Sequence, residues 1–454
     1  MKIKLVTKTL NTLSFLYFCH MFKNKTAAFY TLGCKLNFAE TSTICRQLIE
    51  IGFSKTDFNN SADLYVINTC SVTENANREC RRIIRKAKKN SPNALIIVTG
   101  CFAQLKPEEI YAIEGVDMVL GASEKFNLPN LLSNLNKKRE TEIYGCKIDN
   151  LKYFNSYSLN DRTRSFLKIQ DGCNYPCTYC TIPLARGQSR CDSITNIIKS
   201  AKEIANQGVK EIVITGVNIG EFKDNEQKLE DLIKELDKIK GVERYRISSI
   251  EPNLITNAII ETVKNSKKFM PHFHIPLQSG SNKILAKMKR RYQKELYEKK
   301  INEIKTNIDN VCIGADVIVG FPGETEEEFN KTVAFIKNLP ISYLHVFPYS
   351  ERENTEAIKF EQKINHNIKN DRSKKLRILS NKLQRKFYEK NLNLNHTALF
   401  ENENKEGMIY GFTENYVKIK LPFKKNLCNK KQKVKLLEID YDGIIKAKLV
   451  TKNY

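Results

Sequence analysis

Residues 165–180, SFLKIQDGCNYPCTYC, indicate the fold and the chemistry of the middle of the chain. Their apolar start predicts a buried strand, and three cysteines follow that strand at once: Cys173, Cys177 and Cys180. The spacing C-x3-C-x2-C brings three thiolates close enough to bind three irons of a [4Fe–4S] cluster. The fourth iron then has no protein ligand, so the amino and carboxylate groups of S-adenosylmethionine can chelate it. An electron from the cluster can then cleave the sulfonium.

Zinc is the competing occupant of such a loop. A zinc site needs four ligands, and no fourth Cys or His lies nearby in the sequence. The spacing therefore favours the iron–sulfur cluster. Tyr175 and Tyr179, which lie between the cysteines, are expected to cover it from bulk water.

Strand and helix patterns alternate through the middle of the chain. The predicted strands are 165–172, 210–220, 244–252, 273–280, 314–323 and 343–350. These units are too few for a closed eight-stranded barrel, so they predict an open (β/α)6 partial barrel over 161–390, with its chemistry at the carboxyl ends of the strands. Thr325 and Glu328 predict a capping box at the start of the helix that follows the fifth strand.

Upstream, short apolar strands are predicted at 27–33, 62–69, 94–100 and 117–123, with a basic amphipathic helix over 77–89. This alternation predicts a parallel α/β sheet domain over 25–137, followed by a polar linker over 138–160.

Cys34, Cys70 and Cys101 each follow one of the first three of these strands. In a parallel sheet the three thiolates meet at one edge, so they predict a second iron–sulfur cluster with an open iron. Gly33 and Gly100 are expected to leave space there for a bulky group. The remaining cysteines share no such pattern and are interpreted as structural: Cys19, Cys45, Cys80, Cys146, Cys191, Cys312 and Cys428.

A basic helical connector over 366–391 leads into a part of the chain whose pattern is purely β. Its predicted strands, near 396–403, 408–412, 416–421, 433–439 and 444–450, indicate a small closed β-barrel over 391–454, with a two-residue hairpin turn at Asp442-Gly443. Aromatic residues alternate there with lysines, a pattern that suits RNA. The residues concerned are Tyr410, Phe412, Tyr416, Phe423, Lys418, Lys420, Lys424 and Lys425, of which Phe412 and Tyr416 are interpreted as barrel core.

The formal charge of +24 indicates a polyanion partner such as nucleic acid, although a Lys- and Asn-rich coding sequence would give the same excess. Thirteen cysteines, an odd and clustered number, indicate a reducing compartment, so we expect a cytoplasmic protein. The apolar residues 10–22 are too short to span a bilayer and lack a cleavage site. We interpret residues 1–24 as an extension, with translation starting at Met21, and expect no membrane association.

These motifs together resemble the radical SAM methylthiotransferase family from about Lys25 onward. The markers are TLGCKLN (31–37), NTCSVTENA (68–76), GCFAQ (100–104), DGCNYPCTYCTIPLARG (171–187), LQSGSNKILAKMKR (277–290) and GFPGET (320–325). GCKLN, NTCSVT, LARGQSR, TGVNIG and HVFPYSER make the chain most similar to the MtaB-type branch, which modifies threonylcarbamoyladenosine in tRNA. The C-terminal barrel resembles the TRAM domain, the RNA-binding module of the family.

The resemblance implies two [4Fe–4S] clusters and two molecules of S-adenosylmethionine per reaction. It assigns radical generation to the cluster on Cys173, Cys177 and Cys180, and sulfur delivery to the cluster on Cys34, Cys70 and Cys101. The product would be the 2-methylthio derivative of N6-threonylcarbamoyladenosine next to the anticodon. A monomer served by an external electron donor and a sulfur source is expected. Asn354 stands where the family pattern has Gly, and Asn also tolerates a positive φ.

Further contacts are expected within the partial barrel. Gly320, Phe321 and Pro322 are expected against the adenine of the cofactor, and Glu251 and Gln278 on its ribose or amino acid part. His272 and His274, on one face of a strand, are interpreted as polar lining of the barrel. Arg186 and Arg190 are expected to bind a carboxylate or phosphate, and Arg186, Lys418 and Lys420 to contact RNA.

Other functions fit parts of the same pattern. The chemistry could act on isopentenyl-adenosine in tRNA or on an aspartate of a ribosomal protein. A radical SAM methyltransferase would use the N-terminal cysteines only structurally, and would hold about four irons instead of about eight. A non-catalytic iron–sulfur protein that binds RNA is the third alternative.

Overall fold

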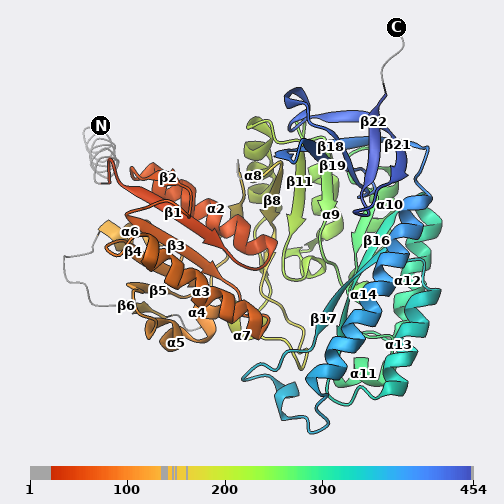
Figure 1. Cartoon of the computed structure of the whole chain (residues 1–454), viewed down its shortest axis with the longest axis horizontal. Helices are drawn as coiled ribbons and strands as arrows, with labels where there is room; N and C mark the ends of the chain where they lie inside the picture. Colours follow the sequence, from red (N-terminus) through yellow and green to blue (C-terminus); the bar gives the residue numbers. More distant parts are fainter. Residues whose placement is uncertain (1–21, 134–141, 146–147, 149–150, 160–161, 451–454) are drawn as a thin grey trace. The chain divides into compact units, whose positions relative to one another are not determined.

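The strands of the N-terminal part pair in parallel in the order β2-β1-β3-β4-β5-β6 (Figure 1). This computed structural model describes residues 22–133, 142–145, 148, 151–159 and 162–450. The proposed extension up to Met21, Cys19, Cys146 and parts of the proposed linker lie outside the described residues. The chain divides into two compact units: the first ends at Ser158 and also includes Thr181–Gln188, and the second holds Leu159–Cys180 and the chain from Ser189 onward.

Central strand β3 shows why the first unit is layered. All six residues of LYVINT are buried, so both faces of the strand are covered. Tyr65 and Ile67 pack in one apolar cluster with Ile83 and Ile84 of helix α3, while Leu64 and Val66 pack in another with residues of helix α2. The elements are β1 (Thr26–Thr31), α2 (Lys35–Glu50), β2 (Ser54–Thr56), β3 (Leu64–Thr69), α3 (Glu74–Asn90), β4 (Leu95–Gly100), α4 (Cys101–Leu105), α5 (Pro107–Tyr111), β5 (Met118–Leu120), α6 (Leu128–Ser133), β6 (Glu142–Tyr144), β7 (Ser156–Tyr157) and α7 (Ile182–Arg186).

The second unit contains the predicted strand–helix repeats. Strands β14, β11 and β8 are neighbours in one parallel sheet, and β15, β16 and β17 in another, with single bridges such as Ser249 to His274 between β14 and β15. These strands form an open partial barrel, as predicted. The elements are β8 (Arg164–Lys168), β9 (Gln170–Asp171), β10 (Arg190–Cys191), α8 (Ile194–Asn206), β11 (Glu211–Thr215), η1 (Ile219–Glu221), β12 (Lys223–Asp224), β13 (Gln227–Lys228), α9 (Leu229–Asp237), β14 (Arg244–Ile247), η2 (Pro252–Leu254), α10 (Asn257–Asn265), β15 (His272–His274), α11 (Asn282–Lys287), α12 (Lys294–Asn307), β16 (Cys312–Val319), α13 (Glu326–Asn338), β17 (Tyr343–Pro348), η3 (Glu356–Lys359) and α14 (His366–Glu389).

The last strands close a barrel in the order β18-β19-β20-β22-β21, around a core that includes Phe400, Ile419 and Leu436. Its elements are β18 (Asn395–Lys405), β19 (Met408–Thr413), β20 (Lys418–Pro422), η4 (Lys425–Leu427), β21 (Lys431–Ile439) and β22 (Ile445–Leu449). None of the helices described is both long and apolar enough to cross a membrane.

Two local predictions need correction. The loop between β21 and β22 is longer than the predicted two-residue turn, since the Asp440 N–H donates to the Ile444 carbonyl. Within this loop the Gly443 N–H donates to the Asp440 carbonyl, so Tyr441 and Asp442 are the central residues of a β-turn. Gly443 follows them and is the loop residue with a positive φ, +77°. The capping box of α13 is half formed, because the Thr325 hydroxyl accepts from the Glu328 N–H, whereas the Glu328 carboxylate accepts from the Ser281 hydroxyl instead of the cap backbone.

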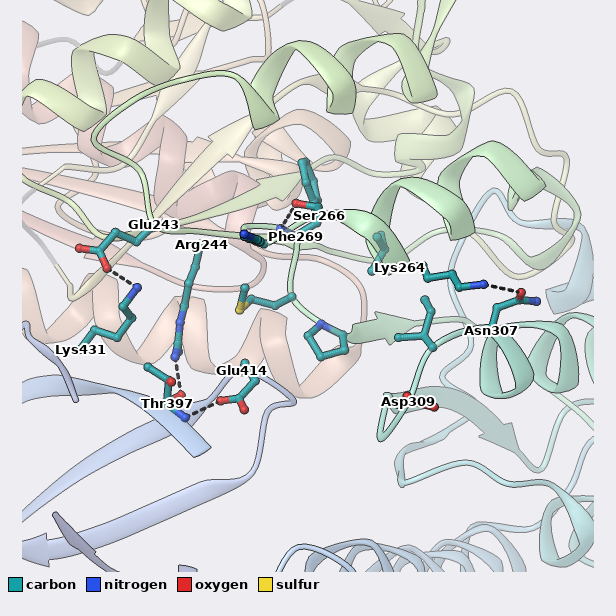
Figure 2. A pocket seen from close by; sticks show the side chains of 15 residues that line it. Glu243, Arg244, Lys264, Ser266, Phe269, Asn307, Asp309, Thr397, Glu414 and Lys431 are labelled. Carbon is teal, nitrogen blue, oxygen red and sulfur yellow. Dashed lines mark hydrogen bonds and ion pairs between the residues drawn. The ribbon is translucent and has the colours of Figure 1, made fainter. Parts of the chain in front are cut away.

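A buried carboxylate joins the partial barrel to the small barrel within the second unit. Arg246 Nε donates to Glu211 at 2.9 Å, and its other nitrogens donate to the Thr413 and Glu414 carbonyls at 2.8 and 2.9 Å. Arg244 likewise reaches the Thr397 carbonyl (Figure 2). Burial opposes the ionisation of Glu211, but the arginines, Arg246 first, outweigh it and lower the pKa of this carboxyl.

We predict that Glu211→Ala lowers the free energy of unfolding by about 3–5 kcal/mol, because buried guanidinium groups lose their counter-charge. Glu243→Ala is the matched control at the same junction: Glu243 pairs with Lys431 and Lys210 near the surface, so its loss should cost less than about 1 kcal/mol. Urea unfolding of both variants measures the difference. Equal losses would contradict the role given to Glu211.

Candidate active site

The first set of cysteines lies at the carboxyl ends of three neighbouring parallel strands. Cys34 follows β1 and caps α2, Cys70 follows β3 directly, and Cys101 begins α4 directly after β4. Since β1, β3 and β4 are adjacent in the sheet, the three residues share one edge. The sequence predicted this arrangement.

The thiols of this set differ in exposure. Cys34 is exposed, while Cys70 and Cys101 are buried. Burial, and next the neighbouring thiol of Cys101, raise the pKa of Cys70 to about 12. Burial also raises the pKa of Cys101, although Arg186 opposes the rise. Since a metal binds thiolates, loading this site requires that protons leave buried thiols.

Gly33 and Gly100 have a different role from the one expected. Both have φ near +99°, and a Cβ on Gly33 would lie 2.8 Å from Cβ of Cys70. A Cβ on Gly100 would lie 2.4 Å from both the Asn68 side chain and the Thr69 carbonyl. The missing side chains therefore make room for the neighbouring strand and its cysteine. This packing is a role that the sequence did not indicate for the two glycines.

A buried polar network lies beside this cysteine set. Arg186 donates to Asn37 Oδ1 at 2.6 Å and to Glu40 Oε1 at 3.0 Å, and Lys125 pairs with Glu40 at 2.7 Å. Asn37 also holds the strand ends, since its amide donates to the Leu32 and Thr69 carbonyls. The Cys34 thiol lies 3.8 Å from Asn37 Oδ1. Two cations and one carboxylate thus leave a net positive charge next to the thiols.

The prediction that Arg186 contacts RNA needs correction. The Arg186 side chain is 4% exposed, because α7 packs against α4 inside the first unit. A guanidinium bound there to Glu40 and Asn37 has no free face for a phosphate. Arg190 is also engaged, since it pairs with Asp171 at 3.2 Å.

Sequence reasoning missed Asn37, Glu40 and Lys125. A signal for Glu40 exists: it lies four residues before Ile44, on the buried stripe of α2 that continues to Leu48. A carboxylate on such a stripe requires a buried cation. The identity of that cation depends on chain segments distant in sequence, which no local pattern reveals.

The second set of cysteines lies in the loop that directly follows β9. Hydrogen bonds from the backbone of this loop to other segments of the chain hold it in place. Thr178 N–H donates to the Met288 carbonyl, and its carbonyl accepts from the Ala357 N–H at 2.8 Å. The Tyr175 N–H points at Cys173 Sγ, 3.4 Å away. Tyr175 is buried beneath Arg291, and Tyr179 packs edge-on against Phe321, so both tyrosines screen the loop.

Arg290 links this loop to a predicted cofactor ligand. Its guanidinium donates to Cys177 Sγ at 3.2 Å and pairs with the carboxylate of Glu251. Burial raises the pKa of Cys177, and Arg290 is the main opposing influence. Arg290 was not singled out from the sequence, although it ends one of the quoted motifs. Its position makes it a donor to the electron-rich sulfur of a ligated cysteine.

One side-chain acceptor and one backbone position near this loop suit a small-molecule cofactor. Gln278 has a φ of +63°, and its buried Oε1 accepts no hydrogen bond from any described residue. An acceptor oriented in this way fits an N–H or O–H of a ligand. Gly320 also has a positive φ, and Phe321 is fully buried against Ile284 and Met288. A ligand at this strand end would therefore meet backbone rather than the Phe321 ring.

The lysines predicted for RNA contact differ from each other. Lys420 is 5% exposed, and its ammonium lies 2.8 Å from Asp440 and 2.7 Å from Asp442. Burial opposes its charge, but the two carboxylates raise the pKa of Lys420. Its charge is thus neutralised by the two carboxylates on the outer face of the small barrel, opposite the core residues Ile419 and Leu421, which corrects the RNA prediction for this residue. Lys418 is half-buried, with its ammonium over the Tyr410 ring.

Phe412 and Tyr416 stack on each other at 4.9 Å, below Arg164 and Arg246 respectively. Tyr416 also packs against the apolar core of the small barrel, as predicted, whereas Phe412 is not part of that core cluster. Both rings join the small barrel to the partial barrel. Asn354, the departure from the family pattern, adopts a φ of +62°, as expected.

We predict that the cluster-free protein at pH 8 is alkylated quickly at Cys34 and at least tenfold more slowly at Cys70. With its pKa near 12, Cys70 is ionised in roughly one molecule in ten thousand at this pH. Raising the pH should speed its reaction, because the thiolate fraction rises. Timed iodoacetamide labelling with peptide mass spectrometry measures both rates. Cys80, buried and with its pKa also raised to about 12, is the matched control. Equal labelling of Cys34 and Cys70 in the folded protein would contradict the arrangement.

Comparison with known proteins agrees with this geometry. The family described as "Uncharacterized protein family UPF0004" matches residues 26–121, and the "Radical SAM superfamily" matches residues 167–336. The chain is 41% identical to the threonylcarbamoyladenosine tRNA methylthiotransferase MtaB of Bacillus subtilis (strain 168), over 92% of this chain and 94% of that protein. It is 40% identical to the protein of the same name from Aquifex aeolicus (strain VF5), over 87% and 96%.

A solved structure shares the fold. The radical S-adenosylmethionine methyltransferase TsrM of Kitasatospora setae superposes with a TM-score of 0.53 at 14% identity, covering 71% of this chain and 73% of that one. Given two matching family regions and relatives that align over nearly their whole length, the chain belongs to the radical SAM methylthiotransferase family, enzymes that transfer a methylthio group.

Proposed function

We propose that this chain converts N6-threonylcarbamoyladenosine next to the anticodon of tRNA to its 2-methylthio derivative. The observation that carries the proposal is the pair of three-cysteine sets, one at the carboxyl ends of three parallel strands and one in the single loop after β9, each in its own unit. The choice of nucleoside rests on the relatives at 40% and 41% identity, both named for it.

Three cysteines suit a [4Fe–4S] cluster with one open iron, whereas a structural zinc site would need a fourth ligand. We assign Cys34, Cys70 and Cys101 to one cluster, and Cys173, Cys177 and Cys180 to the other. When bound, the second cluster supplies the electron that cleaves S-adenosylmethionine, and the first supplies the sulfur that is transferred. Membership of the family implies both clusters and the cofactor.

The protein's own residues prepare the two sites. Arg290 donates to Cys177 and is held in place by Glu251, so it stabilises negative charge on that sulfur. Arg186 and Lys125 favour the thiolate of Cys101. Gln278 offers a buried acceptor for the cofactor. Cys70 and Cys101 are shielded from water, while Cys34 is exposed.

For RNA binding we propose the exposed face of α14 in addition to the small barrel. Its outward residues include Lys374, Arg377, Lys382 and Lys386, a row of cations suited to phosphates. With Arg186 and Lys420 engaged elsewhere, the remaining barrel candidates are Lys418 and the exposed Lys424 and Lys425. We place the reaction in the cytoplasm, with the chain acting as a monomer and receiving electrons and sulfur from other proteins.

We predict that the anaerobically reconstituted protein holds about eight irons per chain, and that Cys70→Ala or Cys177→Ala each lowers this to about four. The reason is that two thiolates hold a cluster poorly. Cys45→Ala, which removes a buried cysteine within α2, is the control and should keep about eight irons per chain. Iron analysis with electron paramagnetic resonance measures the loss. A wild-type value of about four would favour a methyltransferase with structural N-terminal cysteines.

We predict that cells lacking this gene lose the 2-methylthio form of threonylcarbamoyladenosine and retain the methylthio form of isopentenyl-adenosine. Nucleoside mass spectrometry of total tRNA measures both. The wild-type gene should restore the product, whereas Cys177→Ala should not. Loss of the isopentenyl form instead would overturn the substrate assignment, and restoration by Cys177→Ala would indicate a non-catalytic RNA-binding protein.

A further inference from the structure

Three side chains from adjacent strands converge on one face of the β15-β16-β17 sheet. Asp316 in β16 is in register with His345 in β17, and His274 in β15 is in register with Gly314, two residues before Asp316. Since alternate residues of a strand share a face, Gly314 and Asp316 project to the same side. Figure 1 shows β16 and β17 side by side. No cysteine is among these three side chains.

The distances between the polar atoms are short. Nε2 of His274 lies 2.9 Å from Oδ1 of Asp316, and Nδ1 of His345 lies 3.8 Å from the same oxygen. All three candidate ligand atoms lie within 4.8 Å of one another. Ligands about 2.1 Å from a metal, at tetrahedral or octahedral angles, are roughly 3.0–3.4 Å apart. Small side-chain rotations would therefore place a metal ion between these atoms.

Tyr343 forms one wall of this group. A Cβ on Gly314 would lie 2.2 Å from Cζ of Tyr343, so glycine is required where this ring crosses the strand. The Tyr343 hydroxyl bonds to Nε2 of His272 at 3.1 Å, and its ring lies 5.3 Å from that of His345. This hydrogen bond uses Nε2 of His272. The two histidines interpreted from sequence as equivalent polar lining thus have different partners.

The site is open on one side. The His274 side chain is 13% exposed, Asp316 22% and His345 53%, so an ion can enter without disturbing the core. Two imidazoles and one carboxylate form a donor set that suits divalent transition metals, with coordination positions left for water or a substrate oxygen. Magnesium and calcium prefer oxygen ligands alone.

We propose that His274, Asp316 and His345 bind a divalent transition metal ion, of which Zn²⁺ is the probe. No cysteine takes part, so occupancy of this site depends neither on the two clusters nor on the nucleoside proposed above. The ion would lie on the β15-β16-β17 sheet of the partial barrel, with open coordination positions toward solvent. In its absence, Nε2 of His274 and Oδ1 of Asp316 bind each other, which keeps the two ligand atoms side by side.

The test uses the enzyme with both clusters loaded, so that the ligand cysteines are occupied. After anaerobic dialysis with a small excess of zinc and removal of the unbound ion, zinc and iron per chain are measured. The wild type should retain about one more zinc per chain than Asp316→Asn or His345→Gln. His366→Gln is the control, because His366 is exposed on α14 and bonds only to Asn370 among the described residues; it should bind zinc like the wild type.

Two further readouts make the outcome decisive. Equal iron content and thermal midpoint in all variants would show that the fold and the clusters are intact. Zinc-edge X-ray absorption should show nitrogen and oxygen neighbours near 2.0–2.1 Å, whereas sulfur near 2.3 Å would place the zinc on cysteines. Zinc content unchanged in Asp316→Asn, or a sulfur-rich spectrum, would overturn the proposal and leave His274 and Asp316 as a hydrogen-bonded pair.

Discussion

The parallel pairing of β1, β3 and β4 is the constraint on which the first cysteine site depends. In an antiparallel sheet, consecutive strands would end at opposite edges, and residues that follow them would lie a strand length apart. Here each strand returns through a helix, so Cys34, Cys70 and Cys101 meet although they are more than thirty residues apart in sequence. Gly33 packs so closely against Cys70 that this edge of the sheet has no room for a side chain at position 33.

Burial then imposes a second requirement, because charge inside the protein must be balanced. Glu40 is fully buried between Arg186 and Lys125, and Glu211 between Arg246 and Arg244. In both places the partners come from distant segments of the chain, so the ion pairs hold the tertiary arrangement together. Removing one partner leaves an uncompensated charge, which costs far more than an exposed pair contributes.

These features explain what the sequence could and could not predict. Strand ends, cysteine convergence and the closed C-terminal barrel follow from local periodicity and chain order, and the structure confirms them. The predictions for Arg186 and Lys420 failed because charge alone does not tell whether an arginine or lysine faces solvent. Their partners, Glu40, Asp440 and Asp442, become neighbours only in the folded chain. The same holds for Asp316 and His345. They lie beside His274 in the folded chain, although the spacing in the sequence did not indicate it.

Each cysteine set has a buried arginine held by a glutamate. Glu40 fixes Arg186 beside the first set, and Glu251 fixes Arg290 beside the second. Burial raises the pKa of Cys101 and of Cys177, and in each case the arginine is the largest opposing influence. An arginine suits this position because it keeps its charge when buried, where a lysine can lose its proton. The glutamate fixes the direction of the guanidinium and limits the surplus positive charge. Both units thus place a glutamate-held arginine beside three cysteines, and the charge of this arginine favours the thiolate form of a buried cysteine.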